Sequence, residues 1–210
     1  MNRAAQFFTE AEKQRIEEAT RAVECCTIGE VAVMVVDSSD QYADAEVIGG
    51  MFLGSLAALL LTMAFLNESI WFYMPLSIIF FFPCRMLCGN IPALKRSLTG
   101  TGRKESAVRR RALQAFYEKG LYRTKANTGV LFFISLLEHK VWVLADKGIN
   151  EKIDQQTLNT FALTVSQGIK EGRACDALCS AIKDSGQILA KHFPLAPGDT
   201  NELSDKVMTE

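Results

Sequence analysis

The chain has 210 residues, a formal net charge of −1 and 49% hydrophobic residues. This length fits one domain or two. The six cysteines lack the spacing of a small disulfide-stapled scaffold, so we expect a reduced, cytoplasmic domain. The first residues are polar and charged around Phe7 and Glu10, without an apolar core, so we expect no signal peptide.

A helix and a strand are predicted before residue 47. Thr9 and Glu12 form a capping-box pattern, and apolar or small residues follow at helical spacing until Gly29. Residues 30–36 are apolar on both faces, which is typical of a strand covered on both sides in an α/β sheet.

Two long apolar segments follow, at residues 47–66 and 70–88. Each has the ~20 residues that a helix needs to cross a ~30 Å hydrocarbon layer. Only the polar residues 67–69 separate them, so the pattern predicts a two-helix transmembrane hairpin over residues 47–88, with the lipid bilayer as a partner.

A stripe of small residues follows one face of the first span. Gly50, Gly54 and Ala58 are spaced by four, and such spacing lets membrane helices approach closely. The stripe predicts an interface, either with the second span around Ser77 and Ile78 or with a second copy of the chain. Chance is the alternative interpretation, because Gly and Ala are common in membrane spans.

Charge is distributed unevenly around the hairpin. Residues 1–46 carry four basic and ten acidic side chains, whereas residues 85–111 carry eight basic ones and one acid. Lys and Arg close to a span stay in the cytoplasm, so two spans place both termini there. Anionic lipid head groups explain the basic cluster at residues 103–111, and we expect no nucleic-acid partner.

The segments after the hairpin predict a basic loop, one helix, an antiparallel strand pair, two amphipathic helices and a disordered tail. Their predicted bounds are 89–102 for the loop, 103–119 for the helix, 130–136 and 140–146 for the strands, 155–170 and 174–192 for the helices, and 195–210 for the tail. The strand at 30–36 has no earlier partner and must pair with the later strands. The soluble domain is therefore discontinuous, from 1–46 and 103–194. We expect an α/β fold, with a small mixed sheet flanked by helices.

Residues 127–135 and 141–149 resemble the TPM domain family, which includes a plant thylakoid-lumen protein involved in photosystem II repair. The family pattern is an Asn-Gly type of turn, an apolar strand ending in Ser, a short turn and a strand ending in Gly. Four residues match this pattern: Asn127, Gly129, Ser135 and Gly148. Residues 190–194 resemble a bacterial branch with such a hairpin, which implies a multi-pass protein of the bacterial inner (cell) membrane.

The resemblance covers residues 7–46 and 105–194 and implies an α/β sandwich. In some members it also implies acid phosphatase activity or bound calcium. This chain departs from the family in two ways: the best-known members are exported, and Ala126 stands where an aspartate is common. The second departure removes one possible metal ligand.

Three aspartates are the candidate metal ligands, for Ca²⁺ or Mg²⁺: Asp37, Asp40 and Asp146. Asp37 and Asp40 follow the first predicted strand, Asp146 ends the third, and carboxylates at strand ends can hold hard cations. Alternatively, each side chain hydrogen-bonds to the main chain of its own turn.

No cluster of residues in the sequence specifies a reaction, so the catalytic residues stay unassigned. Ser135 lacks the Gly-x-Ser-x-Gly elbow of a nucleophile, and His139 stands in a turn next to Glu138. We therefore expect a membrane-anchored TPM-like domain with a role in partner binding or membrane-protein maintenance. The alternative is a metal-dependent phosphatase of the same family.

Overall fold

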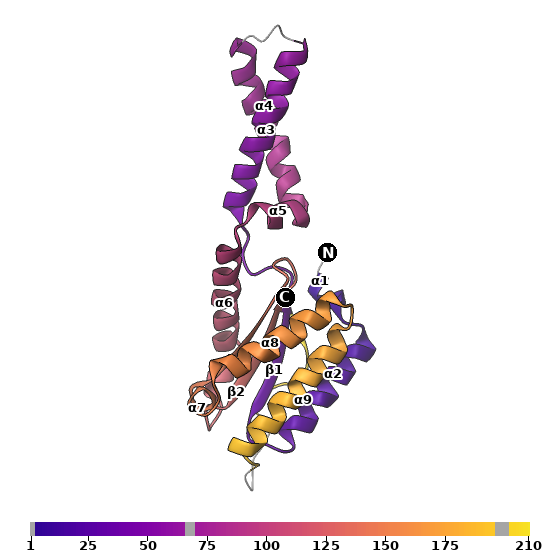
Figure 1. The fold of residues 1–210 in the computed structure, drawn as a ribbon, viewed down its shortest axis with the longest axis vertical. Helices are drawn as coiled ribbons and strands as arrows, with labels where there is room; N and C mark the ends of the chain where they lie inside the picture. Colours follow the sequence, from indigo (N-terminus) through magenta and orange to yellow (C-terminus); the bar gives the residue numbers. More distant parts are fainter. Residues whose placement is uncertain (1–2, 66–69, 196–201) are drawn as a thin grey trace. The chain divides into compact units, whose positions relative to one another are not determined.

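A computed structural model describes residues 3–65, 70–195 and 202–210 of the chain. The chain divides into two units, one of Met1–Ser39 with Glu105–Glu210 and one of Asp40–Lys104 (Figure 1). The first unit is thus built from two separate stretches of sequence. The polar residues 67–69, predicted to link the two spans, lie outside the described residues.

The first unit contains one mixed sheet with the strand order β3-β2-β1-β4. β1 (Glu30–Val36) is parallel to β2 (Gly129–Ser135), and β2 is antiparallel to β3 (Lys140–Ala145). β4 (Met208–Thr209) lies parallel to β1 on its other edge. Every residue of β1 and β2 is buried, which explains their continuous apolar pattern. The α/β class with a small mixed sheet is confirmed.

One face of the sheet is covered by helices from both ends of the chain (Figure 1). These are α1 (Arg3–Phe7), α2 (Glu10–Glu24), α8 (Gln155–Lys170) and α9 (Ala174–His192). The capping box at Thr9 is formed, and the predicted bounds of α8 and α9 are confirmed. The short helix α7 (Lys147–Asn150) adds a buried isoleucine to the same core.

The opposite face of the sheet is covered by α6 (Thr101–Glu118) and by the 3₁₀ turn η1 (Leu121–Arg123). The buried side of α6 is the stripe that its 3.6-residue periodicity predicts. This stripe consists of Ala107, Val108, Ala112, Ala115 and Phe116. The sheet therefore lies between two helical layers, which buries both of its faces.

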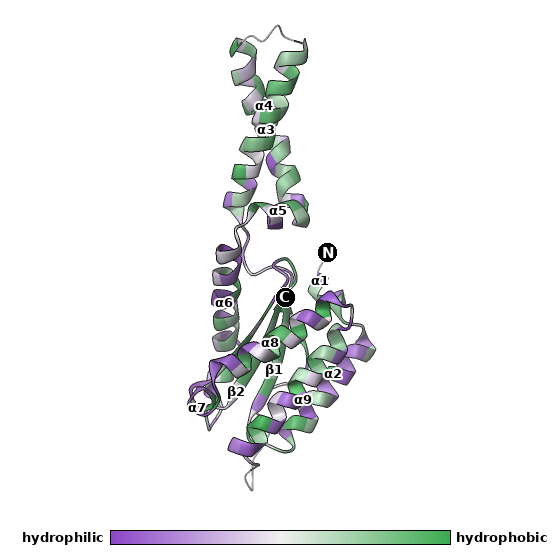
Figure 2. Cartoon of the chain, viewed as in Figure 1, coloured by the Kyte–Doolittle hydropathy of each residue, from purple (hydrophilic) through white to green (hydrophobic). Residues whose placement is uncertain are grey.

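The second unit contains α3 (Ala43–Phe65), α4 (Ile70–Asn90) and α5 (Pro92–Leu98). Within the described residues, α3 and α4 are the two helices that are long and apolar enough to cross a membrane. Figure 2 shows apolar residues over most of their length. Many large apolar side chains on these helices are exposed, including Phe52 (67%) and Trp71 (85%). A bilayer would cover such surface.

The small-residue stripe of α3 faces α4. A Cβ atom built on Gly50 would lie 2.8 Å from Cβ of Arg85, and one on Gly54 would lie 3.0 Å from the main-chain nitrogen of Phe81. Ala58 is fully buried. The two glycines thus contact Arg85 and Phe81 of α4. Ile78, which was predicted together with Ser77 to lie at this interface, is 64% exposed. Self-association through this stripe stays a prediction.

Two segments differ from the predicted loop and tail. The segment 89–102 contains α5, which has a proline in its first turn, where a missing N–H costs no hydrogen bond. The tail contains β4, because main-chain groups at the free edge of β1 hold an otherwise polar segment. Residues 196–201 of the tail lie outside the described residues.

Candidate functional site: a basic pocket beside the β2–β3 turn

A cavity of about 590 Å³ lies in the first unit, where β2 turns into β3. Its walls come from α1, the two strands and the C-terminal half of α8. These elements meet because Ser135 pairs with Lys140 at the turn, while α8 packs on β3 and α1 on β1. We call this cavity the basic pocket.

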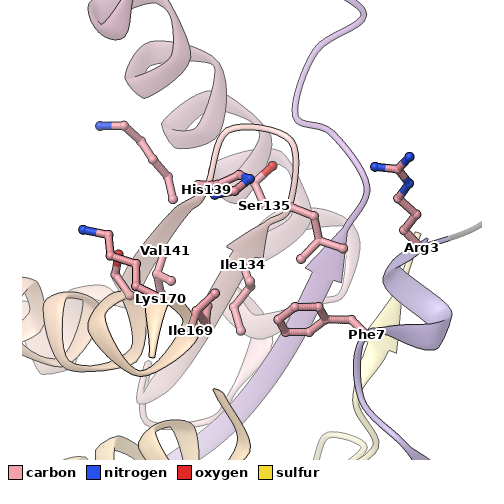
Figure 3. Close-up of a pocket in the computed structure, with 11 residues that line it drawn as sticks. Arg3, Phe7, Ile134, Ser135, His139, Val141, Ile169 and Lys170 are labelled. Atoms are coloured by element: carbon pink, nitrogen blue, oxygen red, sulfur yellow. The ribbon is translucent and has the colours of Figure 1, made fainter. Parts of the chain in front are cut away.

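The floor of the basic pocket is apolar. Figure 3 shows Ile134 with Ile169 on one side and Phe7 on the other. Leu136 and Val141 complete the floor. All five side chains belong to the core under the helical face or pack against it, so a rigid part of the domain supports the floor.

The rim of the basic pocket carries three cationic side chains and a histidine: Arg3, Lys140, Lys170 and His139. No acidic residue lines the pocket among the described residues. Nζ of Lys140 lies 3.1 Å from a carboxylate oxygen of Glu105, which balances part of this charge. The side chains of Arg3 and Lys170 form no ion pair within the described part of the chain. The rim therefore suits an anionic group.

The turn that carries the rim is fixed by a buried hydrogen-bonded cluster. The Ser39 hydroxyl donates to Oγ of Ser135 (2.8 Å), and Ser135 donates to the carboxylate of Glu138. The main-chain N–H of Ser39 donates to the same carboxylate (3.0 Å). The Ser135 hydroxyl thus links the segment after β1 to the turn, and because Ser135 is only 1% exposed it does not act as an accessible nucleophile. No local sequence pattern indicated this cluster, because Ser39 lies 96 residues from Ser135.

The backbone of the turn is also specific. His139 has a φ of +53°, in the left-handed region that few non-glycine residues adopt. Its N–H donates to the main-chain oxygen of Leu136 (3.3 Å), which closes the turn. The imidazole is thereby placed at the pocket rim, a position that spacing alone did not indicate.

The three candidate aspartates each bind main-chain N–H groups. Asp37 accepts from the N–H groups of Arg3 (3.1 Å) and Ala4. Asp40 accepts from the N–H of its neighbour at 2.7 Å, and Asp146 caps α7 with a bond of the same length. Asp40 and Asp146 thus bind the main chain of their own turns, as in the alternative considered above, whereas Asp37 binds the start of α1.

The structure keeps two of these aspartates, Asp37 and Asp146, apart. Asp37 follows β1 at the end of the sheet where β2 finishes, whereas Asp146 follows β3 next to the start of β2. Asp40 belongs to the other unit. No group of three or more His, Cys, Asp or Glu that could hold a metal ion occurs in the described ranges. Metal binding by the three aspartates stays a prediction.

The residues that carry the TPM resemblance shape the backbone. Asn127 has a φ of +53° in the turn before β2. A Cβ atom on Gly129 would lie 2.6 Å from the carbonyl oxygen of Leu121, and one on Gly148 would lie 2.8 Å from that of Asn127. Only glycine allows such close approach, so these positions serve the fold.

Comparison with known proteins agrees with this geometry. The TPM domain family model matches residues 96–188. No curated protein matches the chain. The NMR structure of the BA42 protein from the psychrophilic bacterium Bizionia argentinensis is similar, with a TM-score of 0.61 and 20% identity over 97% of this chain and 96% of that one. At this identity the likeness shows a shared fold. The resemblance is thus confirmed over residues 96–188, the part of the chain that matches the TPM domain family model.

Proposed function

We propose that this chain is a membrane-anchored TPM domain that binds a partner protein close to the bilayer through the basic pocket. The observation that supports this role is the lining of the pocket, in which the described residues place cations above an apolar floor and include no acid. Its volume lies within the range of about 300–1,000 Å³ typical of ligand sites. Such a surface is complementary to a segment in which acidic and apolar residues alternate.

Anchoring is the part of the proposal that α3 and α4 support. Both helices are long and apolar enough to span a bilayer. We place them in a bacterial inner membrane as a multi-pass anchor with both termini in the cytoplasm. The partner would then be a cytoplasmic segment of a membrane protein, which fits a maintenance role.

A metal-dependent phosphatase is the alternative. It needs carboxylates that converge on a cation. Among the described residues, Asp37 and Asp146 lie at opposite ends of the sheet, and their oxygens accept main-chain hydrogen bonds. The geometry therefore favours the binding role.

The test uses the full chain in lipid nanodiscs and a fluorescent peptide of alternating Glu and Leu. We expect saturable binding that weakens with salt and that a Lys–Leu peptide does not reproduce. Lys170→Glu should weaken binding by about tenfold, because it reverses a rim charge. Lys183→Glu, exposed on α9 and outside the pocket lining, is the matched control.

Two outcomes would contradict the proposal. Equal loss in both lysine variants would mean that the peptide responds only to overall charge. Hydrolysis of p-nitrophenyl phosphate by the same preparation with Mg²⁺ or Ca²⁺, lost on Asp37→Asn, would support the phosphatase instead.

A further inference from the structure

The edge of β1 that faces away from β2 is occupied by the end of the chain. Met34 pairs with Met208, and Val35 pairs with Thr209. The N–H of Glu210 donates to the main-chain oxygen of Val35 (3.0 Å), and the N–H of Asp37 donates to that of Glu210 (2.9 Å). We call residues 202–210 the C-terminal segment. Its main chain pairs with N–H and C=O groups that would have no partner at an open sheet edge.

Charged side chains fix both ends of the C-terminal segment. The Glu210 carboxylate forms ion pairs with Arg111 and with Lys119 (3.2 Å), both from the α6 side of the sheet. At the other end, the Glu202 carboxylate pairs with Nζ of Lys125 (3.4 Å), and the Glu202 N–H donates to the buried carboxyl group of Glu30 (3.0 Å). The sheet edge thus offers cations where the segment is acidic.

Apolar side chains of the C-terminal segment contact both faces of the sheet. Val207 packs against the core under α2, α8 and α9, whereas Leu203 and Met208 pack against the core under α6. Main-chain pairing at the edge, with the neighbouring Val207 and Met208 on opposite faces, resembles the way in which sheets bind extended peptides. The paired stretch is only two residues long, so an extended competitor has few ladder bonds to replace.

We propose that the β1 edge is a strand-addition site for an extended acidic segment of a partner protein, and that the C-terminal segment occupies this site in cis. The partner segment carries an apolar residue in the place of Met208 and an acid in the place of Glu210. This surface is separate from the basic pocket, so the inference goes beyond the function proposed above. Occupation in cis lowers the apparent affinity for the partner by the fraction of sites that are free.

The first experiment uses the full chain with Arg111→Glu and Lys119→Glu. These changes repel the chain's own Glu210 and favour a basic residue in its place. A fluorescent nonapeptide with the sequence of residues 202–210, carrying Lys for Glu210, should bind saturably. The unmodified nonapeptide should bind at least about tenfold more weakly, and so should a scrambled one.

A second variant lacks residues 202–210, so its β1 edge is open. It should bind the unmodified nonapeptide at least about tenfold more tightly than the full chain does. Lys170→Glu in the basic pocket should leave this binding unchanged, which separates the inference from the proposed function. Absence of peptide binding in both variants would overturn the strand-addition site. Equal binding by the full chain would also overturn it, because the peptide would then lie elsewhere.

Discussion

Several polar side chains of the sheet domain bind main-chain groups at the ends of strands and helices. Asp37 receives the first N–H groups of α1, and Asp146 receives that of α7. Glu138 holds the turn between β2 and β3 through Ser135 and Ser39. Buried or partly buried carboxylates are costly unless such donors satisfy them, so these residues stabilise the fold near the basic pocket.

Glu24 is a titratable side chain in a different setting. Burial is the main cause that raises the pKa of Glu24 to about 8; the neighbouring carboxyl groups of Glu30 and Asp205 add to this shift, and the hydrogen bond from the Val31 N–H opposes it. Between the unfolded pKa of 4.5 and about 8, the folded state therefore binds more protons than the unfolded state. The stabilisation that Glu24 contributes to the folded state is complete below pH 4.5 and is lost as the pH rises through about 8.

Glu24→Gln should remove most of this dependence, because glutamine resembles the protonated acid and can still accept from Val31. We expect the variant to lose less stability than the parent between pH 6 and pH 9. Urea unfolding of both chains at the two pH values measures this. Glu18→Gln, at an exposed position of the same helix, is the control and should follow the parent. Parallel curves for Glu24→Gln and the parent would show that Glu24 does not titrate in this range.

At the scale of elements, regular patterns predicted the structure well where they extended over several turns or a whole strand. β1, α8 and α9 have the predicted bounds. The prediction for β2 was one residue late, because Gly129 pairs with Glu30 and extends the ladder. The glycine looked like part of the turn.

Short elements could not be predicted, because distant contacts make them. α1 has five residues and depends on Asp37, and β4 has two residues and depends on the edge of β1. The basic pocket was missed for the same reason. Its rim joins Arg3, His139 and Lys170, which no local pattern connects.

The α3–α4 hairpin allows a test at this scale. Gly54→Ile places a branched side chain where a Cβ atom would already lie 3.0 Å from the Phe81 nitrogen and 3.1 Å from the carbonyl carbon of Phe80. The two helices must then separate, so we expect faster proteolysis of the hairpin in membranes. Leu60→Ile, at a 59% exposed position, is the control and should be mild. Equal protease resistance of the two variants would mean that the glycine face does not pack against α4.

For the whole molecule, the opposite charges on the two sides of the hairpin meet in the second unit. Nζ of Lys95 lies 2.8 Å from the Glu46 carboxylate, and Arg103 forms an ion pair with Asp44. These pairs give a structural role to two acidic residues in the first turn of α3. They leave the orientation signal intact, because topology follows the number of Lys and Arg near the spans and depends little on Asp and Glu.

The last prediction concerns this orientation. Eight basic residues lie between residues 85 and 111, and the polar residues 67–69 contain none. Retaining the basic side in the cytoplasm places both termini there, since two spans return the chain to the side on which it began. A reporter that is active only outside the cytoplasm should therefore be silent when fused after Glu210. The same reporter inserted within residues 67–69 should be active, which controls for expression and insertion. Activity of the Glu210 fusion together with silence of the inserted reporter would reverse the topology and place the basic pocket outside the cell membrane.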